Sequence, residues 1–181
     1  ELGLLIGVLS GALLALLHAF FCVHLRADQI VSGTAINFLA LGLTGYLFID
    51  IYGEQGTPTT VAGIPDVNIP ALQDLGFLGA TFGSLNLMIW LSFAVVVISY
   101  FVMFRTTIGL RIRSVGEHPR AAETVGISVY GIRYACVITS GALAALGGAY
   151  LSLSDVHLFD QNLTGGRGFI ALAALIFGNW R

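Results

Sequence analysis

Long apolar stretches alternate with short polar segments along this chain of 181 residues. Runs without Asp, Glu, Lys or Arg cover residues 2–25, 29–49, 75–104, 134–154 and 168–180. An α-helix needs about 20 apolar residues to cross a bilayer, because only internal hydrogen bonds satisfy the backbone in lipid. The pattern therefore predicts membrane spans at 2–25, 30–49, 84–104 and 134–154. A fifth apolar run, at 168–181, is either a half-span or a span that is cut short.

Composition agrees with this pattern, since 56% of the residues are hydrophobic and only 10% are charged. Soluble globular proteins average about 25% charged residues. The predicted fold class is an all-α, polytopic integral membrane helix bundle. The first run has no basic segment and no clear cleavage site, so it does not have the form of a signal peptide. The chain begins with Glu1 and ends inside an apolar run, so we expect a fragment of one larger transmembrane domain.

The charges are distributed unevenly between the two sides of the predicted membrane. Arg26 and the segment 105–133 hold six of the eight basic residues, whereas the segment 50–83 has four acidic residues and no basic one. Cytoplasmic loops are enriched in basic residues. We therefore expect Arg26 and 105–133 in the cytoplasm and 50–83 as an extracytoplasmic loop. That loop, with a short interfacial helix expected at 71–78, is either a lid, a surface for an external partner or a passive connector.

Small residues recur at every fourth position in two of the predicted spans. The first span carries one such stripe: Gly3, Gly7, Gly11, Ala15 and Ala19. The fourth carries two adjoining stripes: Gly141/Ala145/Ala149 and Ser140/Ala144/Gly148/Ser152. Small residues allow helix backbones to approach closely in a membrane. We expect these faces to be buried in protein, either within one subunit or at a seam between two subunits.

Two polar groups are expected at or near membrane depth. Asn37 lies in the glycine-rich run 30–49. Its amide either bonds to a neighbouring helix or marks a broken helix that lines a polar pathway. Arg167 follows the fourth span. It either lies at the outer interface, where it snorkels or pairs with Asp155 or Asp160, or dips toward the midplane, where it requires a partner or a water-filled cavity.

The sequence lacks the residues that common catalytic sites require. It contains no lysine, and hence no phosphate-binding GxxxxGK[ST] loop, and it has neither HExxH nor GxSxG. Ser32 and Ser140 each precede a glycine, but no histidine is expected beside either. His18, Cys22 and His24 form an HxxxCxH pattern in which only the first two share a helical face, so no metal site is expected. We expect no catalytic residue in this chain. If the protein performs a process that requires energy, that energy has to come from a partner or from an ion gradient.

The segment 105–133, RTTIGLRIRSVGEHPRAAETVGISVYGIR, is the most informative polar segment. It holds five of the eight basic residues, and its glycines and Pro119 predict a short helix bounded by turns. An ordered basic loop on the cytoplasmic side indicates contact with another protein.

A family resemblance rests on this loop and on the segments around it. The runs GLRIRSVGEHPRAAETVGISVYGIRYACVITSGALAALGGAYLSL and TGGRGFIALAALIFGNW, with IVSGTAINFLALGLTGYL before them, resemble permease subunits of bacterial ABC importers. The family is that of the ribose and branched-chain amino acid permeases, and the likeness is closest to its simple-sugar and nucleoside branch. The resemblance implies the ABC-importer permease fold in the bacterial inner membrane. It also implies a second permease chain, cytoplasmic ATPases that bind ATP and Mg²⁺, and an extracytoplasmic binding protein. No cofactor in this chain and no nucleic-acid partner are implied.

The resemblance also implies roles for particular residues. The loop would form a coupling helix on the ATPase, through basic, acidic and small residues: Arg111, Arg113, Glu117, His118, Pro119, Arg120, Ala121, Ala122 and Gly126. Ala121 and Ala122 are small enough for close docking, and Pro119 fits a first helical turn. Three polar residues are candidates for the substrate path: Asn37, Thr164 and Arg167. The function expected is ATP-driven import of a nucleoside or simple sugar by alternating access. The alternative is an ion-coupled secondary transporter or a channel.

Overall fold

A computed structural model describes residues 2–53, 63, 66–68, 84–155, 157–159 and 163–178, with backbone alone at 66–68, 84 and 155. Four described helices are long and apolar enough to cross a membrane. They are α1 (Leu2–Ala19) with its π-helical continuation η1 (Phe20–His24), α2 (Gln29–Tyr52), α5 (Leu87–Arg105), and α8 (Val129–Tyr150) with its π-helical continuation η2 (Leu151–Asp155). They coincide with the four long apolar runs, so the all-α polytopic class is confirmed.

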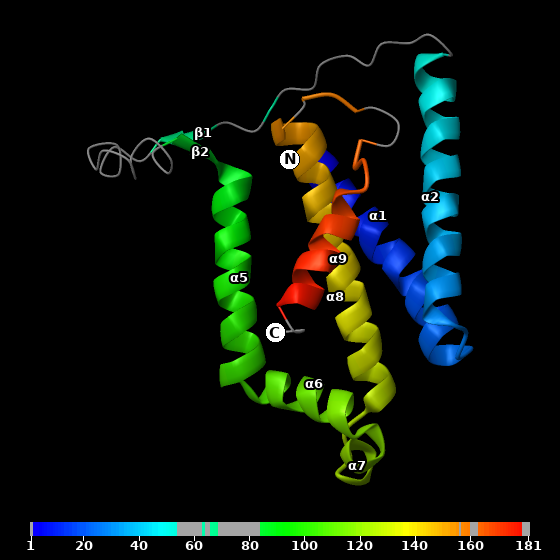
Figure 1. The fold of residues 1–181 in the computed structure, drawn as a ribbon, viewed down its shortest axis with the longest axis vertical. Coiled ribbons are helices and arrows are strands. Elements are labelled where there is room, and N and C mark those ends of the chain that lie inside the picture. The colour runs from blue at the N-terminus through cyan, green and yellow to red at the C-terminus, as the bar shows by residue number, and fades with distance from the viewer. Residues whose placement is uncertain are drawn as a thin grey trace.

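Shorter elements join and flank these spans (Figure 1). Two helices, α6 (Thr107–Glu117) and α7 (Pro119–Thr124), connect the ends of α5 and α8. An 11-residue apolar helix, α9 (Arg167–Phe177), follows η2 and lies in the position of the fifth apolar run. Strands β1 (Asp66–Asn68) and β2 (Ser84–Asn86) form an antiparallel pair at the opposite end of the molecule from α7. The short helix expected at 71–78 lies outside the described residues.

Two predicted span boundaries were wrong because side-chain caps decide where the helices begin. Residues Ser84–Asn86 are strand β2 and not the start of a span; α5 begins at Leu87, where the Asn86 side chain accepts a hydrogen bond from the Met88 N–H (3.0 Å). Helix α8 begins at Val129 rather than at residue 134, since the Ser128 hydroxyl accepts from the Gly131 N–H (3.3 Å). Such caps satisfy backbone donors that the first turn leaves unpaired.

Helix α2 is continuous, so the broken-helix interpretation of residues 30–49 was wrong. Asp28 caps its start by accepting from Ile30 N–H (2.8 Å) and Val31 N–H (3.1 Å). The hydroxyls of Thr34 and Thr44 donate to carbonyls of their own helix. An interior glycine costs a helix only about 1 kcal/mol relative to alanine. Internal hydrogen bonding therefore outweighs the poor local propensity.

The stripe on α1 packs directly against one stripe on α8. A Cβ added at Gly11 would collide with Ala145, and one added at Gly141 would collide with Ala15. Ala15 and Ala19 are buried. The prediction of close packing by small residues is confirmed for this pair, and the contact lies within one chain.

The second stripe on α8 does not follow that prediction. Ser140, Ala144 and Gly148 are exposed in this chain, and a Cβ at Gly148 would meet nothing within 4 Å. The two stripes adjoin on the helix, and α1 packs against Gly141 and Ala145 of the first. Gly148 and Ser152 of the second line an open space, together with Ala145 and Ala149 of the first.

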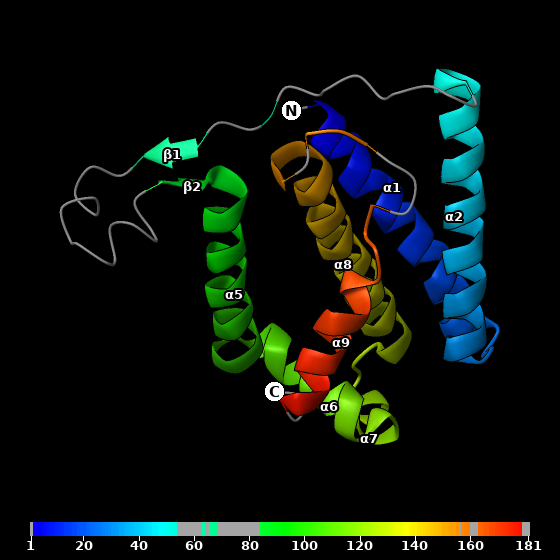
Figure 2. The same ribbon diagram turned by 45° about the horizontal axis from the view of Figure 1, so that its top comes forward.

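The two basic segments lie at the same end of the described structure. Helix α6 crosses between the ends of α5 and α8, α7 projects beyond it, and the α1–α2 turn lies at that end as well (Figures 1 and 2). Arg26, in that turn, donates to the Tyr130 hydroxyl near the start of α8 (3.5 Å). This hydrogen bond raises the pKa of Arg26. The arrangement agrees with the basic side expected from the charge pattern.

Candidate functional site

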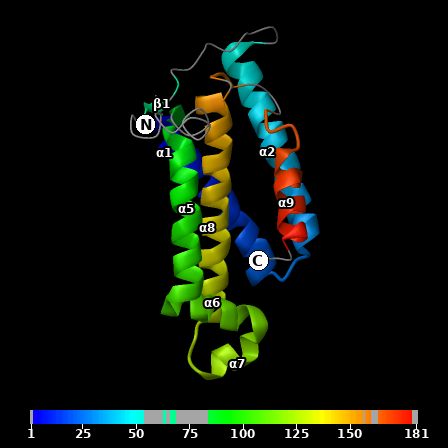
Figure 3. The same ribbon diagram turned by 60° about the vertical axis from the view of Figure 1, so that its left-hand side comes forward.

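A cavity of about 800 Å³ opens between α1, α2, α8, η2 and the segment leading into α9. Helices α1 and α2 meet at the α1–α2 turn and diverge toward the other end, while α1 crosses α8 (Figures 1 and 2). In the view of Figure 3, α8 lies between α5 and α9. The cavity lies where α1 and α2 have diverged: Gly11 of α1 packs against α8, whereas Gly3 and Gly7 nearer its start line the open space.

Two of the three candidate residues for the substrate path line this cavity, Asn37 from α2 and Thr164 from the turn before α9. Arg167 is not among the lining residues, although Gly166 and Gly168 on either side of it are. Arg167 is the first residue of α9, and its N–H donates to the Thr164 carbonyl (2.9 Å). Its predicted pairing with Asp155 or Asp160 lies outside what the structure describes.

Four polar side chains are found among the described lining residues, and two of them are already engaged. Thr44 donates to the Ala40 carbonyl (2.7 Å) and Ser152 to the Ala149 carbonyl (3.2 Å). Asn37 and Thr164 have no side-chain hydrogen bond to another described residue. The interhelical hydrogen bond considered for Asn37 is therefore not formed within the described part of the chain. Both groups remain available to a ligand.

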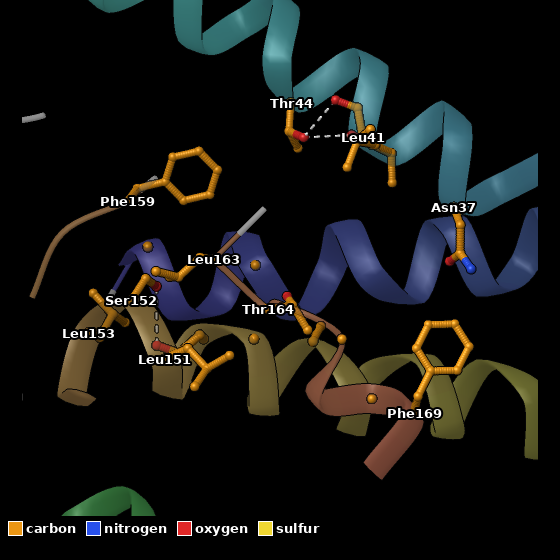
Figure 4. A pocket seen from close by; sticks show the side chains of 18 of the residues that line it. Asn37, Leu41, Thr44, Leu151, Ser152, Leu153, Phe159, Leu163, Thr164 and Phe169 are labelled. Atoms are coloured by element: carbon orange, nitrogen blue, oxygen red, sulfur yellow. Dashed lines mark hydrogen bonds between the residues drawn. The ribbon is translucent and has the colours of Figure 1, made fainter. Parts of the chain in front are cut away.

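Two aromatic side chains also line the cavity, and the sequence reasoning missed both (Figure 4). Phe169, on α9, is 73% exposed. Phe159 lies toward the other end of the cavity and tilts against Phe48, with ring centroids 6.2 Å apart. An aromatic residue in an apolar run gives no sequence signal that separates a cavity wall from a lipid-facing surface.

A polar contact fastens α1 to α2 beside the cavity. His18 Nδ1 lies 2.9 Å from the Ser32 hydroxyl, and Ser32 is buried. The expectation that no histidine stands beside Ser32 was wrong, because the turn at residues 25–28 brings two positions far apart in the sequence together. Cys22 Sγ lies 3.6 Å from His18 Nε2, whereas the ring of His24 stacks on Phe20. His24 thus contacts Phe20 rather than the His18–Cys22 pair, in agreement with its position off the helical face that those two residues share.

The second candidate region is the corner formed by α6, α7 and the start of α8. The predicted short helix is confirmed as α7, with Pro119 at its first position. Gly126 turns the chain out of α7 with a φ of +83°, a conformation that favours glycine, and its N–H donates to the Glu123 carbonyl (3.0 Å). The corner has its own small core, Val115, Ala122 and Val129.

One of the two alanines considered for docking faces this core. Ala122 is only 4% exposed, so it holds α7 against α6 and α8 and is not available to a partner. Ala121 is exposed, as are five other candidate residues of the corner: Arg111, Glu117, His118, Arg120 and Gly126. Arg113 is exposed too, but its guanidinium lies over the Phe104 ring at 5.3 Å, which gives it a partner within the chain. Ala121 and Ala122 therefore lie on different faces of α7. The sequence does not show which face is buried, because that depends on the bend between α6 and α7.

Residues 1–181 match the model of a family described as the branched-chain amino acid transport system permease component. The chain belongs to this permease family. It is an integral membrane protein, and the part of the chain that the structure describes contains four long apolar helices. No solved structure matches the chain.

Curated relatives of this permease chain carry transport names. It is 46% identical to the guanosine ABC transporter permease protein NupQ of Bacillus subtilis, over 99% of this chain and 56% of the relative. It is 42% identical to the nucleoside ABC transporter permease protein NupC of Lactococcus lactis, over 99% of this chain and 56% of the relative. A putative glucose ABC transporter permease protein, TsgC13 of Haloferax volcanii, is 34% identical over 99% of this chain and 54% of the relative. The permease chain thus spans about half the length of these relatives.

Proposed function

We propose that this chain is the membrane-spanning part of a permease subunit in an ATP-driven importer, which takes up a nucleoside or a simple sugar by alternating access. The match to a permease family over all 181 residues carries the proposal. The names of the relatives support the solute class, since they specify guanosine, nucleoside and glucose transport. The membrane is the cytoplasmic membrane of a bacterium.

The α6–α7 corner is the proposed contact with a cytoplasmic ATPase. Its buried core, Val115, Ala122 and Val129, fixes α7 to the ends of the spans, so a displacement of α7 would move α8 with it. The exposed charges of the corner, including Glu117 and Arg120, would pair with complementary charges on the ATPase. ATP and Mg²⁺ would bind on that partner, because this chain has no lysine and no phosphate-binding loop.

The cavity is the proposed solute path, with Asn37 and Thr164 as its polar contacts and Arg167 beside its wall. A second permease chain, identical or similar, would close the side of the cavity that this chain leaves open. An extracytoplasmic binding protein would deliver the solute at the end opposite α7. The solute would not be chemically modified. The spans would tilt, so that the cavity opens first to the outer side of the membrane and then to the cytoplasm.

Capture of the ATPase tests the coupling contact. The full permease is purified from membranes that also contain the ATPase encoded beside it. We expect Ala121→Trp to abolish co-purification, because the large indole on the exposed face of α7 would prevent close docking without entering the corner core. Ala27→Trp is the matched control, since Ala27 is also exposed and lies in the α1–α2 turn at the same end.

The outcomes separate the two classes of transporter. Capture by wild type and by Ala27→Trp, with loss in Ala121→Trp, supports the importer. A wild-type permease that never captures an ATPase, and whose uptake collapses when the ion gradient is dissipated, contradicts it and supports an ion-coupled transporter.

A further inference from the structure

We infer that the cavity recognises the flat base of a nucleoside, with Phe169 stacking on its face and the Asn37 amide hydrogen-bonding to its edge. The inference rests on the proposed transport function and chooses between the two solute classes that it leaves open. Three properties of the described wall support this choice: its charge, its supply of hydrogen bonds and its aromatic surface.

None of the described residues that line the cavity is charged. A zwitterionic solute, such as an amino acid, would have to shed water from an ammonium and a carboxylate group there. Unpaired charges are costly to remove from water. A neutral solute therefore fits this wall, and both nucleosides and sugars are neutral.

The supply of hydrogen bonds separates these two classes. The hydroxyl protons of Thr44 and Ser152 are used within their own helices, which leaves Asn37 and Thr164 as the side chains on the described wall that can still donate. A sugar carries hydroxyl groups around its whole ring, and each one that loses water without gaining a partner weakens binding. A nucleobase concentrates its donors and acceptors on its edges. One amide can pair there with an adjacent donor and acceptor, as asparagine does with adenine.

An exposed aromatic ring on the cavity wall offers a surface on which the flat face of a base can stack. Phe169 is 73% exposed and has no ring partner among the described residues, whereas Phe159 already contacts Phe48. Figure 4 shows Phe169 toward the end of the cavity where Asn37 lies. Bases stack readily on phenylalanine rings while their edges hydrogen-bond to amides. Phe169 and Asn37 together offer the two contacts that a base requires.

The experiment measures uptake by cells that contain the complete importer with the full-length permease. The probes are radiolabelled adenosine, uridine and glucose, each at a saturating concentration so that the binding protein is filled. We expect uptake of a nucleoside and not of glucose. We expect Phe169→Leu to lower the nucleoside rate about tenfold, within the range that loss of one base–aromatic stack produces.

Three further variants keep the result interpretable. Phe177→Leu is the matched control, because Phe177 is an exposed aromatic residue on the same helix, outside the described lining of the cavity. It should transport at the wild-type rate. Phe169→Trp retains a stacking surface and should restore most of the activity that Phe169→Leu loses. Asn37→Leu should also lower nucleoside uptake.

The inference is overturned by uptake of glucose in preference to both nucleosides, by the absence of nucleoside uptake, or by equal rates in Phe169→Leu and Phe177→Leu. ATPase capture is measured on the same membranes. Capture that persists in those cases means that the permease function stands and only the assignment of the base is wrong. Loss of capture in the wild type contradicts the permease function itself.

Discussion

The α6–α7 corner and the cavity are built on opposite principles. At the corner, Val115, Ala122 and Val129 are buried against one another although α6 and α7 are short and polar. In the cavity, Asn37 comes from a long span, Phe169 from an apolar helix and Thr164 from the turn before that helix, and none of the three side chains is buried. The polar α6–α7 corner is thus locally well packed, whereas the cavity lies among the apolar membrane helices.

This difference fits the two tasks proposed for the permease. A contact that transmits movement has to keep its shape, and close packing resists deformation. A path for a solute needs volume and unsatisfied polar groups, which packing would remove. Substitutions should therefore cost stability at the corner and cost transport, but little stability, in the cavity.

The largest effect is expected from Ala122→Phe. Ala122 is 4% exposed and has no room for a ring, and overpacking a core costs about 1–3 kcal/mol or more. We expect a loss near the upper end of that range, a lower unfolding temperature of the full permease in detergent, and no ATPase capture. Ala121→Trp, one position earlier, should lose capture at an unchanged unfolding temperature. Equal unfolding temperatures for the two variants would show that the corner is not a packed unit.

A second substitution tests packing inside the membrane. Gly141→Ala places a Cβ against Ala15, so α1 and α8 have to separate, and we expect a loss of about 2 kcal/mol. Gly148→Ala is the control on the same helix, since a Cβ there meets nothing within 4 Å. It should be neutral or slightly stabilising, because alanine is the better helix former. Thermal unfolding of both proteins in the same detergent measures the difference.

Gly126→Ala should have an intermediate effect. The φ of +83° at this turn disfavours any side chain, and left-handed backbone costs an alanine about 1–2 kcal/mol. Limited proteolysis of the turn between α7 and α8 should become faster. Gly116→Ala, on a right-handed helical turn with open space around its Cβ, should leave the digestion rate unchanged.

The smallest effect on stability is expected in the cavity. Thr164→Val keeps the shape of a side chain that has no hydrogen bond to another described residue. The unfolding free energy should change by less than about 0.5 kcal/mol. Nucleoside uptake should nevertheless fall, because a ligand loses one of two available polar contacts. A fall in stability without a change in uptake would contradict the contrast between the corner and the cavity.

Much of the architecture was predictable because the membrane imposes simple rules on the backbone. Four runs of sufficient length became four helices, and Gly11 and Ala15 of the predicted stripe on α1 pack against Ala145 and Gly141 on α8. The boundaries at Leu87 and Val129 were missed, since Asn86 and Ser128 begin helices through caps rather than through hydrophobicity. The alternative of a broken helix at residues 30–49 was wrong, because α2 is continuous and retains its internal hydrogen bonds.

The candidate sites were only partly predictable. Asn37 and Thr164 were found as polar groups in apolar surroundings, but nothing in the sequence distinguishes Phe169 on the cavity wall from the other aromatic residues. Ala121 and Ala122 look equivalent in the chain, and the bend between α6 and α7 buries one and exposes the other. His18 and Ser32 are 14 positions apart and became neighbours only through the turn between their helices.

The sequence by itself determined the class of the protein, its spans, its basic side and the family to which it belongs, because these depend on local hydrophobicity, charge and motif. The tertiary structure alone decided which faces meet. Helix α1 packs closely against α8, while α2 diverges from α1 away from the turn that joins them. The cavity lies between these diverging helices. Contacts between distant segments depend on helix crossing and phase, which no single apolar run encodes.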